Sequence, residues 1–258
     1  MVWVVLSGYA TYTCVFMNHR IAKAMLTEAE KRGDLLDKEG NKKTILAASS
    51  GNTGCSLALV GTLMGFDVII ITNKKCSDEK CAHIRANGAT LWLAEKLPDQ
   101  FPECLAGVTD YMAQEKVLCN EFPDKYYSVN QYDNLDNLQA HYSSTGKEIW
   151  EQTNGAVTHF IMAGSTGGTI MGVGKFLKEK RSNVEIVLSD PHKSHLSGIW
   201  ESENKDSSIK CQGKKKLKDV EELIKKEGGI QVEGAGKSGL TAIMKHGGVL
   251  QFVDFCER

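Results

Sequence analysis

The clearest periodic pattern near the start of the chain covers residues 20–33, RIAKAMLTEAEKRG. Apolar side chains recur there with helical spacing and share one face: Ile21, Ala24, Met25 and Ala29. Gly33 follows directly, at the position where a glycine commonly ends a helix. These residues predict an amphipathic helix that ends at Gly33.

Beyond this helix, short apolar runs alternate with longer helical stretches. The runs of strand length cover residues 43–48, 66–72, 89–94, 126–129, 158–163 and 184–190. The helical stretches cover residues 52–63, 77–88, about 101–120, 135–153 and 170–180. Several strands are apolar throughout, as in parallel sheets that are covered on both faces. The alternation predicts an α/β fold with largely parallel sheets flanked by helices.

Two segments do not fit this alternation. Residues 1–19 match no pattern that identifies them, and their apolar run is shorter than the ~7–15 residues of a signal-peptide core. Residues 201–229 are rich in lysine and lack strand signals. Only a narrow apolar stripe is present there for a helix: Leu217, Val220 and Ile224. Because acidic residues lie among the lysines, we expect a solvated surface insertion rather than a nucleic-acid contact.

Composition narrows the classes of protein that remain. The chain has 258 residues, of which 41% are hydrophobic and 24% charged, and its net charge is −1. This balance gives no electrostatic bias toward nucleic acid or an anionic membrane, and no apolar run is long enough to span a membrane. The eight cysteines form no CxxC pair, and a disulfide framework would be unusual in a chain of this length. We therefore expect a cytoplasmic protein with reduced thiols, without a metal site and without a nucleic-acid or membrane partner.

Two glycine-rich turns each connect a predicted strand to a predicted helix: SSGNTG at 49–54 and GSTGGT at 164–169. In parallel sheets such turns lie at the carboxyl ends of strands, where ligands bind, and the N–H groups at the helix start favour an anion. Thr166 and Thr169 add hydroxyls to the second turn, so it suits a phosphate, although it is neither a Walker A nor a GxGxxG motif. The alternative is a tight turn that needs glycine for packing alone.

The first turn suits a different anion. Its hydroxyls and backbone amides match a carboxylate, and the side chain of Asn52 can hydrogen-bond a phenolate or carbonyl oxygen. The alternative is an ordinary capped helix start. One turn for a phosphate and another for a carboxylate together indicate a phosphorylated cofactor that handles an amino acid.

In their order along the chain, these motifs resemble those of the fold-type II pyridoxal-phosphate enzymes of the cysteine synthase and cystathionine β-synthase family. The similarity is carried by RIAKAMLTEAEKRG, SSGNTG, CSDEKCAHIRANGA, NQYDN, AHYSSTGKEIWEQTNG and GSTGGTIMGVGKFLKEK. It covers about 20–196 and resumes at VEGAG, residues 232–236. The resemblance implies a two-lobed catalytic fold over residues 20–258, with a smaller lobe at about 44–140 and a larger lobe formed by the remainder. It also implies a homodimer and a pyridoxal-phosphate dependent β-replacement on serine or O-acetylserine by sulfide or a thiol.

The resemblance also assigns roles to residues of both turns. The substrate carboxylate would be bound by Ser49, Ser50, Gly51 and Thr53. Gln131 would help to position the substrate, and Asn52 would face the O3′ oxygen of the cofactor. The 5′-phosphate of pyridoxal phosphate would be bound by Ser165, Thr166, Gly167, Gly168 and Thr169.

One departure from the family pattern bears directly on the chemistry. The Schiff-base lysine of the family stands directly before the helix at Arg20, and this chain has FMNHRI there, with Asn18 at the lysine position and His19 next. Asparagine can neither form the covalent link nor act as general base, and loss of the acid–base role alone costs roughly 10²–10⁴-fold in rate. Lys23 lies five positions further along, on a different face of the helix. We therefore expect no covalent linkage of the cofactor.

Further departures leave three hypotheses open. Ser165 replaces the first glycine of the phosphate turn, the strands expected before the first helix are missing, and the chain ends before the segment that supplies a serine facing the pyridine nitrogen. The chain is then a working β-replacement enzyme with an unusual anchor, a noncatalytic relative that binds pyridoxal phosphate or an amino acid without turnover, or an incomplete gene product.

Overall fold

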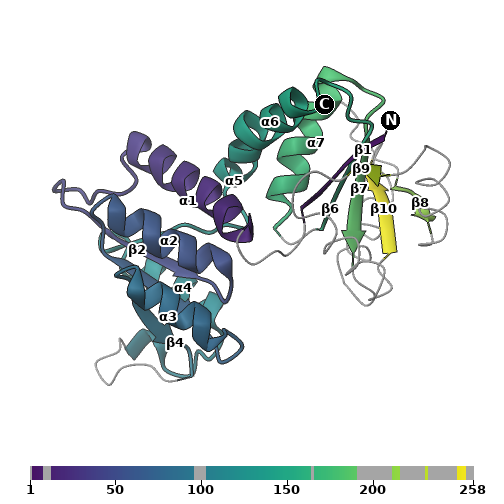
Figure 1. Cartoon of the computed structure of the whole chain (residues 1–258). Coiled ribbons are helices and arrows are strands. Elements are labelled where there is room, and N and C mark those ends of the chain that lie inside the picture. Colours follow the sequence, from purple (N-terminus) through teal and green to yellow (C-terminus); the bar gives the residue numbers. More distant parts are fainter. Residues whose placement is uncertain are drawn as a thin grey trace. The chain divides into compact units, whose positions relative to one another are not determined.

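The computed structural model divides the chain into two compact units, each with its own sheet (Figure 1). One unit comprises Cys14–Asn137, and the other combines Met1–Thr13 with Leu138–Arg258. The residues that the structure describes are 2–7, 13–95, 103–163, 166–190, 211–215, 230–231 and 249–253.

A parallel sheet of four strands forms the middle of the Cys14–Asn137 unit, in the order β4-β3-β2-β5. The strands are Thr44–Ala48 (β2), Val68–Thr72 (β3), Thr90–Leu93 (β4) and Tyr126–Ser128 (β5). All neighbouring strands pair in parallel. Each strand lies within an apolar run from which the sequence predicts a strand. Because β2 and β5 are parallel neighbours, their carboxyl ends meet at one edge of the sheet.

Both faces of this sheet are covered by helices. α2 (Asn52–Leu63) packs on the face that carries Val68 and Ile70. A Cβ at Gly61 of α2 would lie 2.6 Å from Val68 Cγ2, so a glycine is needed for this close approach. The core on the opposite face, beneath α4 (Tyr111–Glu121), consists of Leu46, Ile71, Ala94, Leu105, Leu118 and Tyr126. Burial on two sides explains why β3 begins with the uninterrupted apolar run VIII.

α1 (Thr13–Arg32) belongs to this unit because its apolar face is buried within it. The buried residues of that face are Ile21, Ala22, Met25, Leu26 and Ala29. The helix ends as the sequence predicts, with Gly33 in the left-handed conformation at φ 80°. It begins earlier than predicted, inside the segment 1–19 that the sequence leaves unassigned. Residues 20–43 belong to this unit as well.

Capping residues set the limits of the two remaining helices. α3 (Asp78–Ala86) lies within the helical stretch predicted at 77–88 and begins directly after Ser77, whose side chain caps its first turn. The helix predicted at about 101–120 is shorter, because Asp110 caps the start of α4. A short 3-10 turn, η1 (Glu103–Leu105), precedes it.

The other unit contains a six-stranded sheet in the order β8-β10-β7-β6-β1-β9. Its strands are Val2–Ser7 (β1), His159–Ala163 (β6), Glu185–Asp190 (β7), Cys211–Lys215 (β8), Ile230–Gln231 (β9) and Val249–Val253 (β10). β9, β1, β6 and β7 pair in parallel, whereas β10 pairs antiparallel with both β7 and β8. Together with the parallel sheet of the first unit, this arrangement confirms the predicted fold class.

Two strands of this sheet correct the sequence prediction. β1 lies in the segment 1–19 and pairs in parallel with β6. A strand therefore precedes the first helix, in a segment in which the sequence predicts none. β8 lies in the lysine-rich segment 201–229, which lacks strand signals. Backbone pairing with β10 supplies its hydrogen bonds, and this pairing does not depend on apolar side chains. The predicted apolar stripe at 217–224 and the VEGAG segment at 232–236 lie outside the described residues.

The long helix predicted at 135–153 contains a π-helical turn. Its parts are α5 (Leu135–Ala140), the π-helical turn η2 (His141–Thr145) and α6 (Gly146–Gln152). α7 (Gly168–Lys180) packs against this turn so closely that a Cβ at Gly172 would lie 2.3 Å from the carbonyl oxygen of Leu138. The core of this unit consists of Ile149, Val157, Phe160, Ile170, Val173, Leu177, Val184 and Ile186.

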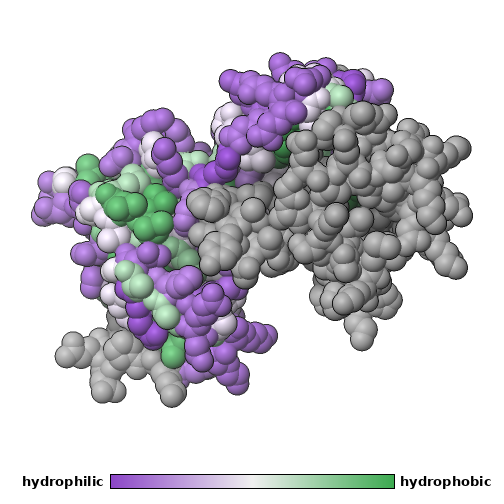
Figure 2. Space-filling model, viewed as in Figure 1, coloured by the Kyte–Doolittle hydropathy of each residue, from purple (hydrophilic) through white to green (hydrophobic). Residues whose placement is uncertain are grey.

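Apolar residues also gather on the surface of the first unit. Figure 2 shows them over α2, where Leu63 is 78% exposed. This helix has 12 residues, far fewer than the ~20 that cross a bilayer. Within the described part of the chain, no helix is long and apolar enough to span a membrane.

The contact at Gly172 gives a prediction for stability. Alanine is a better helix former than glycine by about 1 kcal/mol, but its Cβ would lie 2.3 Å from Leu138 O and 2.8 Å from His141 Cβ. We expect the steric effect to dominate, so that Gly172→Ala lowers the free energy of unfolding by about 1–3 kcal/mol in urea titrations. Lys175→Ala, an exposed change in the same helix, should alter it by less than about 0.5 kcal/mol. Equal stability of the two variants would contradict the close packing.

Candidate functional site

The turn between β2 and α2 is ordered by one buried serine. Ser49 is 5% exposed, and its Oγ accepts hydrogen bonds from the backbone N–H groups of Gly51 at 3.3 Å and Gly54 at 3.0 Å. These N–H groups lie at the start of a helix, where they have no partner within the helix itself. Ser50, Gly51 and Asn52 are half-buried in the same turn. Four of the predicted substrate residues, 49–51 and 53, thus lie in one ordered turn at the carboxyl end of β2.

α1 brings Asn18 against this turn. The Thr53 hydroxyl donates a hydrogen bond to Asn18 Oδ1 at 3.1 Å, although the two residues are 35 positions apart in the chain. The neighbouring His19 contacts α2 instead, with Nδ1 at 2.7 Å from Ser56 Oγ, and burial lowers the pKa of this histidine. Lys23, the next lysine along α1, is exposed. A carboxamide rather than an amine therefore contacts the predicted substrate turn.

The loop after β5 brings Gln131 to the same edge of the sheet. Asn130, directly before it, has a left-handed φ of 39°. The backbone carbonyl of Gln131 accepts a hydrogen bond from Asn137 Nδ2 at 3.0 Å. Asn134 Nδ2 donates a hydrogen bond to the backbone carbonyl of Val129 at 3.1 Å. Side-chain amides thus order the NQYDN segment in place of regular secondary structure. Gln131 and Ala48 line a cavity of about 40 Å³ at this edge.

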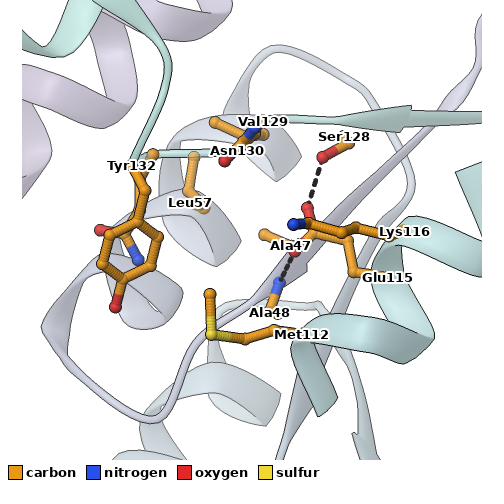
Figure 3. A pocket seen from close by; sticks show the side chains of 11 residues that line it. Ala47, Ala48, Leu57, Met112, Glu115, Lys116, Ser128, Val129, Asn130 and Tyr132 are labelled. Carbon is orange, nitrogen blue, oxygen red and sulfur yellow. Dashed lines mark hydrogen bonds between the residues drawn. The ribbon is translucent and has the colours of Figure 1, made fainter. Parts of the chain in front are cut away.

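The sequence does not identify Glu115, a buried carboxylate that borders the same cavity. Glu115 lies on α4 and is 8% exposed. Its carboxylate accepts hydrogen bonds from the Ala48 N–H at 2.8 Å and the Ser128 hydroxyl at 2.6 Å (Figure 3). Burial raises the pKa of this carboxyl, and the hydrogen bonds oppose that rise. Because glutamate is common on exposed helix faces, neither its type nor its spacing distinguishes it in the sequence.

The second glycine-rich turn lies in the other unit, between β6 and α7. Gly167 is left-handed at φ 81° directly before the helix, a conformation that favours glycine. Thr166 Oγ1 accepts a hydrogen bond from the Gly168 N–H at 3.4 Å, and Thr169 Oγ1 lies 3.1 Å from His141 Nε2. The first turn of α7 contains no acidic residue, so no carboxylate there offsets the positive end of the helix dipole.

The described residues of this turn fit a phosphate group, whereas the residue at position 18 does not fit a covalently attached cofactor. A flexible glycine backbone, threonine hydroxyls and the N-terminus of a helix form a donor set that suits phosphate. Ser165, the remaining residue of this predicted set, lies outside the described residues. At position 18 the side-chain nitrogen belongs to an amide, and such a nitrogen does not condense with an aldehyde. The described residues contain no cluster of three or more His, Cys, Asp or Glu that could hold a metal ion.

Comparison with known proteins identifies the family. Residues 17–242 match the family model of the pyridoxal-phosphate dependent enzymes. The chain belongs to this family. It is 39% identical to the cysteine synthase of Aquifex aeolicus over 191 residues, which cover 74% of this chain and 54% of that enzyme. It is 31% identical to cysteine synthase B of Salmonella typhimurium over 272 residues, which cover 100% of this chain and 84% of the relative.

A solved structure supports the same family. The O-acetyl serine sulfhydrylase isoform 3 of Entamoeba histolytica matches with a TM-score of 0.59 and 35% identity, over 70% of this chain and 50% of that structure. The chain thus spans about half the length of this structure and of the Aquifex enzyme. The family predicted from the motifs, that of cysteine synthase and cystathionine β-synthase, is confirmed, and pyridoxal phosphate is its cofactor.

The buried hydroxyl of Ser49 gives a testable prediction. Ser49→Ala removes the acceptor of two N–H groups, and we expect a loss of about 1–2 kcal/mol in the free energy of unfolding. Amide exchange at Gly54 should accelerate in the same variant. Ser50→Ala is the matched control, for which we expect a change below about 0.5 kcal/mol. If both variants unfold at the same urea concentration, Ser49 does not order the turn.

Proposed function

We propose that this chain binds pyridoxal phosphate without a covalent link, together with an amino acid, and does not itself carry out the β-replacement of its family. The observation that carries this proposal is the hydrogen bond from Thr53 to Asn18. The residue at the anchor position is a carboxamide engaged with the predicted substrate turn. The proposed site keeps residues suited to binding, but position 18 lacks the lysine amine of the family.

The missing amine matters because it has two roles in the family. Pyridoxal phosphate, when bound, acts as an electron sink that makes bonds at the substrate Cα labile. The lysine of the family anchors the cofactor and moves the Cα proton. Asn18 can accept and donate hydrogen bonds, but a carboxamide nitrogen is not basic near neutral pH. The residues at this position can therefore orient a ligand without transferring its proton.

Binding roles are proposed for the residues around Asn18. The turn formed by Ser49, Ser50, Gly51 and Thr53 would take the carboxylate of the amino acid, and its buried Ser49 supports this role by fixing the turn. Asn52 would face the O3′ oxygen of the cofactor, and Gln131 would position the amino acid. Residues 165–169 would hold the 5′-phosphate, a role supported by the donor set at the start of α7.

His19 is a poor substitute for the missing base. Its Nδ1 is 2.7 Å from Ser56 Oγ, so one ring nitrogen is already engaged on α2. Burial lowers the pKa of the ring, and a weaker base takes up a proton less readily. An imidazole also cannot form the link that a lysine forms with the cofactor. His19 therefore does not restore the chemistry lost at Asn18.

A working β-replacement enzyme is the second candidate function. The names of the relatives, cysteine synthase and cysteine synthase B, favour it. In that case the amine would come from a lysine elsewhere in the chain. This requirement makes the two candidates experimentally distinct.

We extend the proposal to a homodimer in the cytoplasm, with two lobes in each copy and a solvated insertion at 201–229. The homodimer and the lobes rest on the family resemblance alone. Reduced cysteines support the location, since five cysteines in the described part of the chain are free: Cys55, Cys76, Cys81, Cys104 and Cys119.

Equilibrium dialysis followed by borohydride reduction tests the proposal. We expect the purified chain to bind pyridoxal phosphate in dialysis but to carry no stoichiometric label after reduction, as measured by peptide mass spectrometry. Asn18→Lys should acquire a label at residue 18, because it restores an amine at the anchor position. Lys23→Ala serves as the control and should behave as the unmodified chain does.

Two results would overturn this proposal. A single stoichiometric label on any lysine of the unmodified chain would support the working enzyme and identify its anchor. Failure to retain pyridoxal phosphate in dialysis, by a chain that is folded by circular dichroism, would exclude the binding role.

A further inference from the structure

Two adjacent side chains of α4 reach across the carboxyl edge of the four-stranded sheet. Gln114 is 0% exposed, and its Nε2 donates to the Ala94 carbonyl at 3.2 Å, directly after β4. Glu115 points to the other half of the edge, where it contacts the ends of β2 and β5. Polar side chains are rarely this deeply buried on a helix unless they are hydrogen-bonded, so the pair has a structural purpose.

The partners of Glu115 lie at the starting points of two loops. The Ala48 N–H, at 2.8 Å, belongs to the residue directly before the turn 49–53. The Ser128 hydroxyl, at 2.6 Å, belongs to the last residue of β5. The backbone of Asn130, the residue directly before Gln131, also acts on this carboxyl and lowers its pKa. One carboxylate thus connects the two loops that carry the proposed amino-acid site.

We propose that Glu115 is a positioning residue for amino-acid binding: its carboxylate fixes the spacing between the turn 49–53 and Gln131. This inference rests on the proposed function, because it assumes that both loops contact the same amino acid. Glu115 and Gln131 line the same cavity of about 40 Å³. Figure 3 shows Glu115 opposite Ser128 of β5 and Asn130 of the loop that follows. A ligand held from both loops depends on that spacing to within a fraction of an ångström.

The chemistry of the carboxylate suits this role. Its two oxygens accept hydrogen bonds from both loops at the same time, and these bonds are strengthened by the charge and by burial. A glutamine has nearly the same shape, and its amide can accept from the Ala48 N–H while donating to Ser128 Oγ. An alanine can do neither. The two substitutions therefore separate loss of the connection from loss of the charge.

Calorimetric titration with L-serine tests the inference. Pyridoxine 5′-phosphate, which lacks the aldehyde and cannot condense with serine, would be added to occupy the cofactor site. We expect Glu115→Ala to weaken L-serine binding at least tenfold at a temperature at which the variant is fully folded, and Glu115→Gln to stay within about threefold of the unmodified chain. Glu121→Ala, an exposed change on the same helix, is the control and should leave the affinity unchanged.

A purely structural role would lower the stability of Glu115→Ala and leave the affinity of its folded form unchanged, and that result would overturn the inference. If Glu115→Gln bound L-serine as weakly as Glu115→Ala, that result would also overturn the inference. The effect would then come from the charge and not from the connection between the loops.

Hydrogen exchange separates this inference from the proposed function. If the unmodified chain does not bind L-serine, the proposed function fails, and exchange in the free protein still decides whether Glu115 connects the loops. In Glu115→Ala we expect faster exchange in both 48–54 and 128–134, with 68–72 in β3 unaffected. Faster exchange in one loop alone, or in neither, would contradict the positioning role.

Discussion

A buried carboxylate must find hydrogen-bond donors, and Glu115 finds them at the ends of two neighbouring strands. The free energy of burying its charge without partners would be several kcal/mol, so the hydrogen bonds from the Ala48 N–H and the Ser128 hydroxyl stabilise the folded unit. This requirement fixes the ends of β2 and β5 relative to α4. The proposed amino-acid site consists of the two loops that leave these fixed points.

Binding and catalysis are separable in such a site. The turn after β2 is ordered by the buried hydroxyl of Ser49, and the NQYDN segment by its own side-chain amides. Neither arrangement depends on the residue at position 18. If position 18 is the anchor position, as we propose, asparagine in place of lysine removes the amine on which the family chemistry depends while the loops keep their order. The hydrogen bond from Thr53 shows that the carboxamide contacts the same turn.

The sequence predicts the elements that carry a strong local pattern. β2, β3 and β6 are apolar runs, and α1 ends at a left-handed glycine, so local rules suffice for them. It does not predict β1, β8, β9 or β10, because β-pairing with a partner distant in the chain determines these strands. The π-helical turn η2 depends likewise on its contact with α7. Glu115 has no signature at all, since only tertiary structure distinguishes a buried glutamate from an exposed one.

Exchange of the Cα proton of L-serine in D₂O, followed by proton NMR in the presence of the chain and pyridoxal phosphate, tests the central claim most directly. Pyridoxal phosphate alone gives the background rate. A chain that binds the amino acid without a base at position 18 should broaden the serine signals saturably and should not raise the exchange rate above that background. Exchange that increases in proportion to the concentration of the chain would contradict a noncatalytic role.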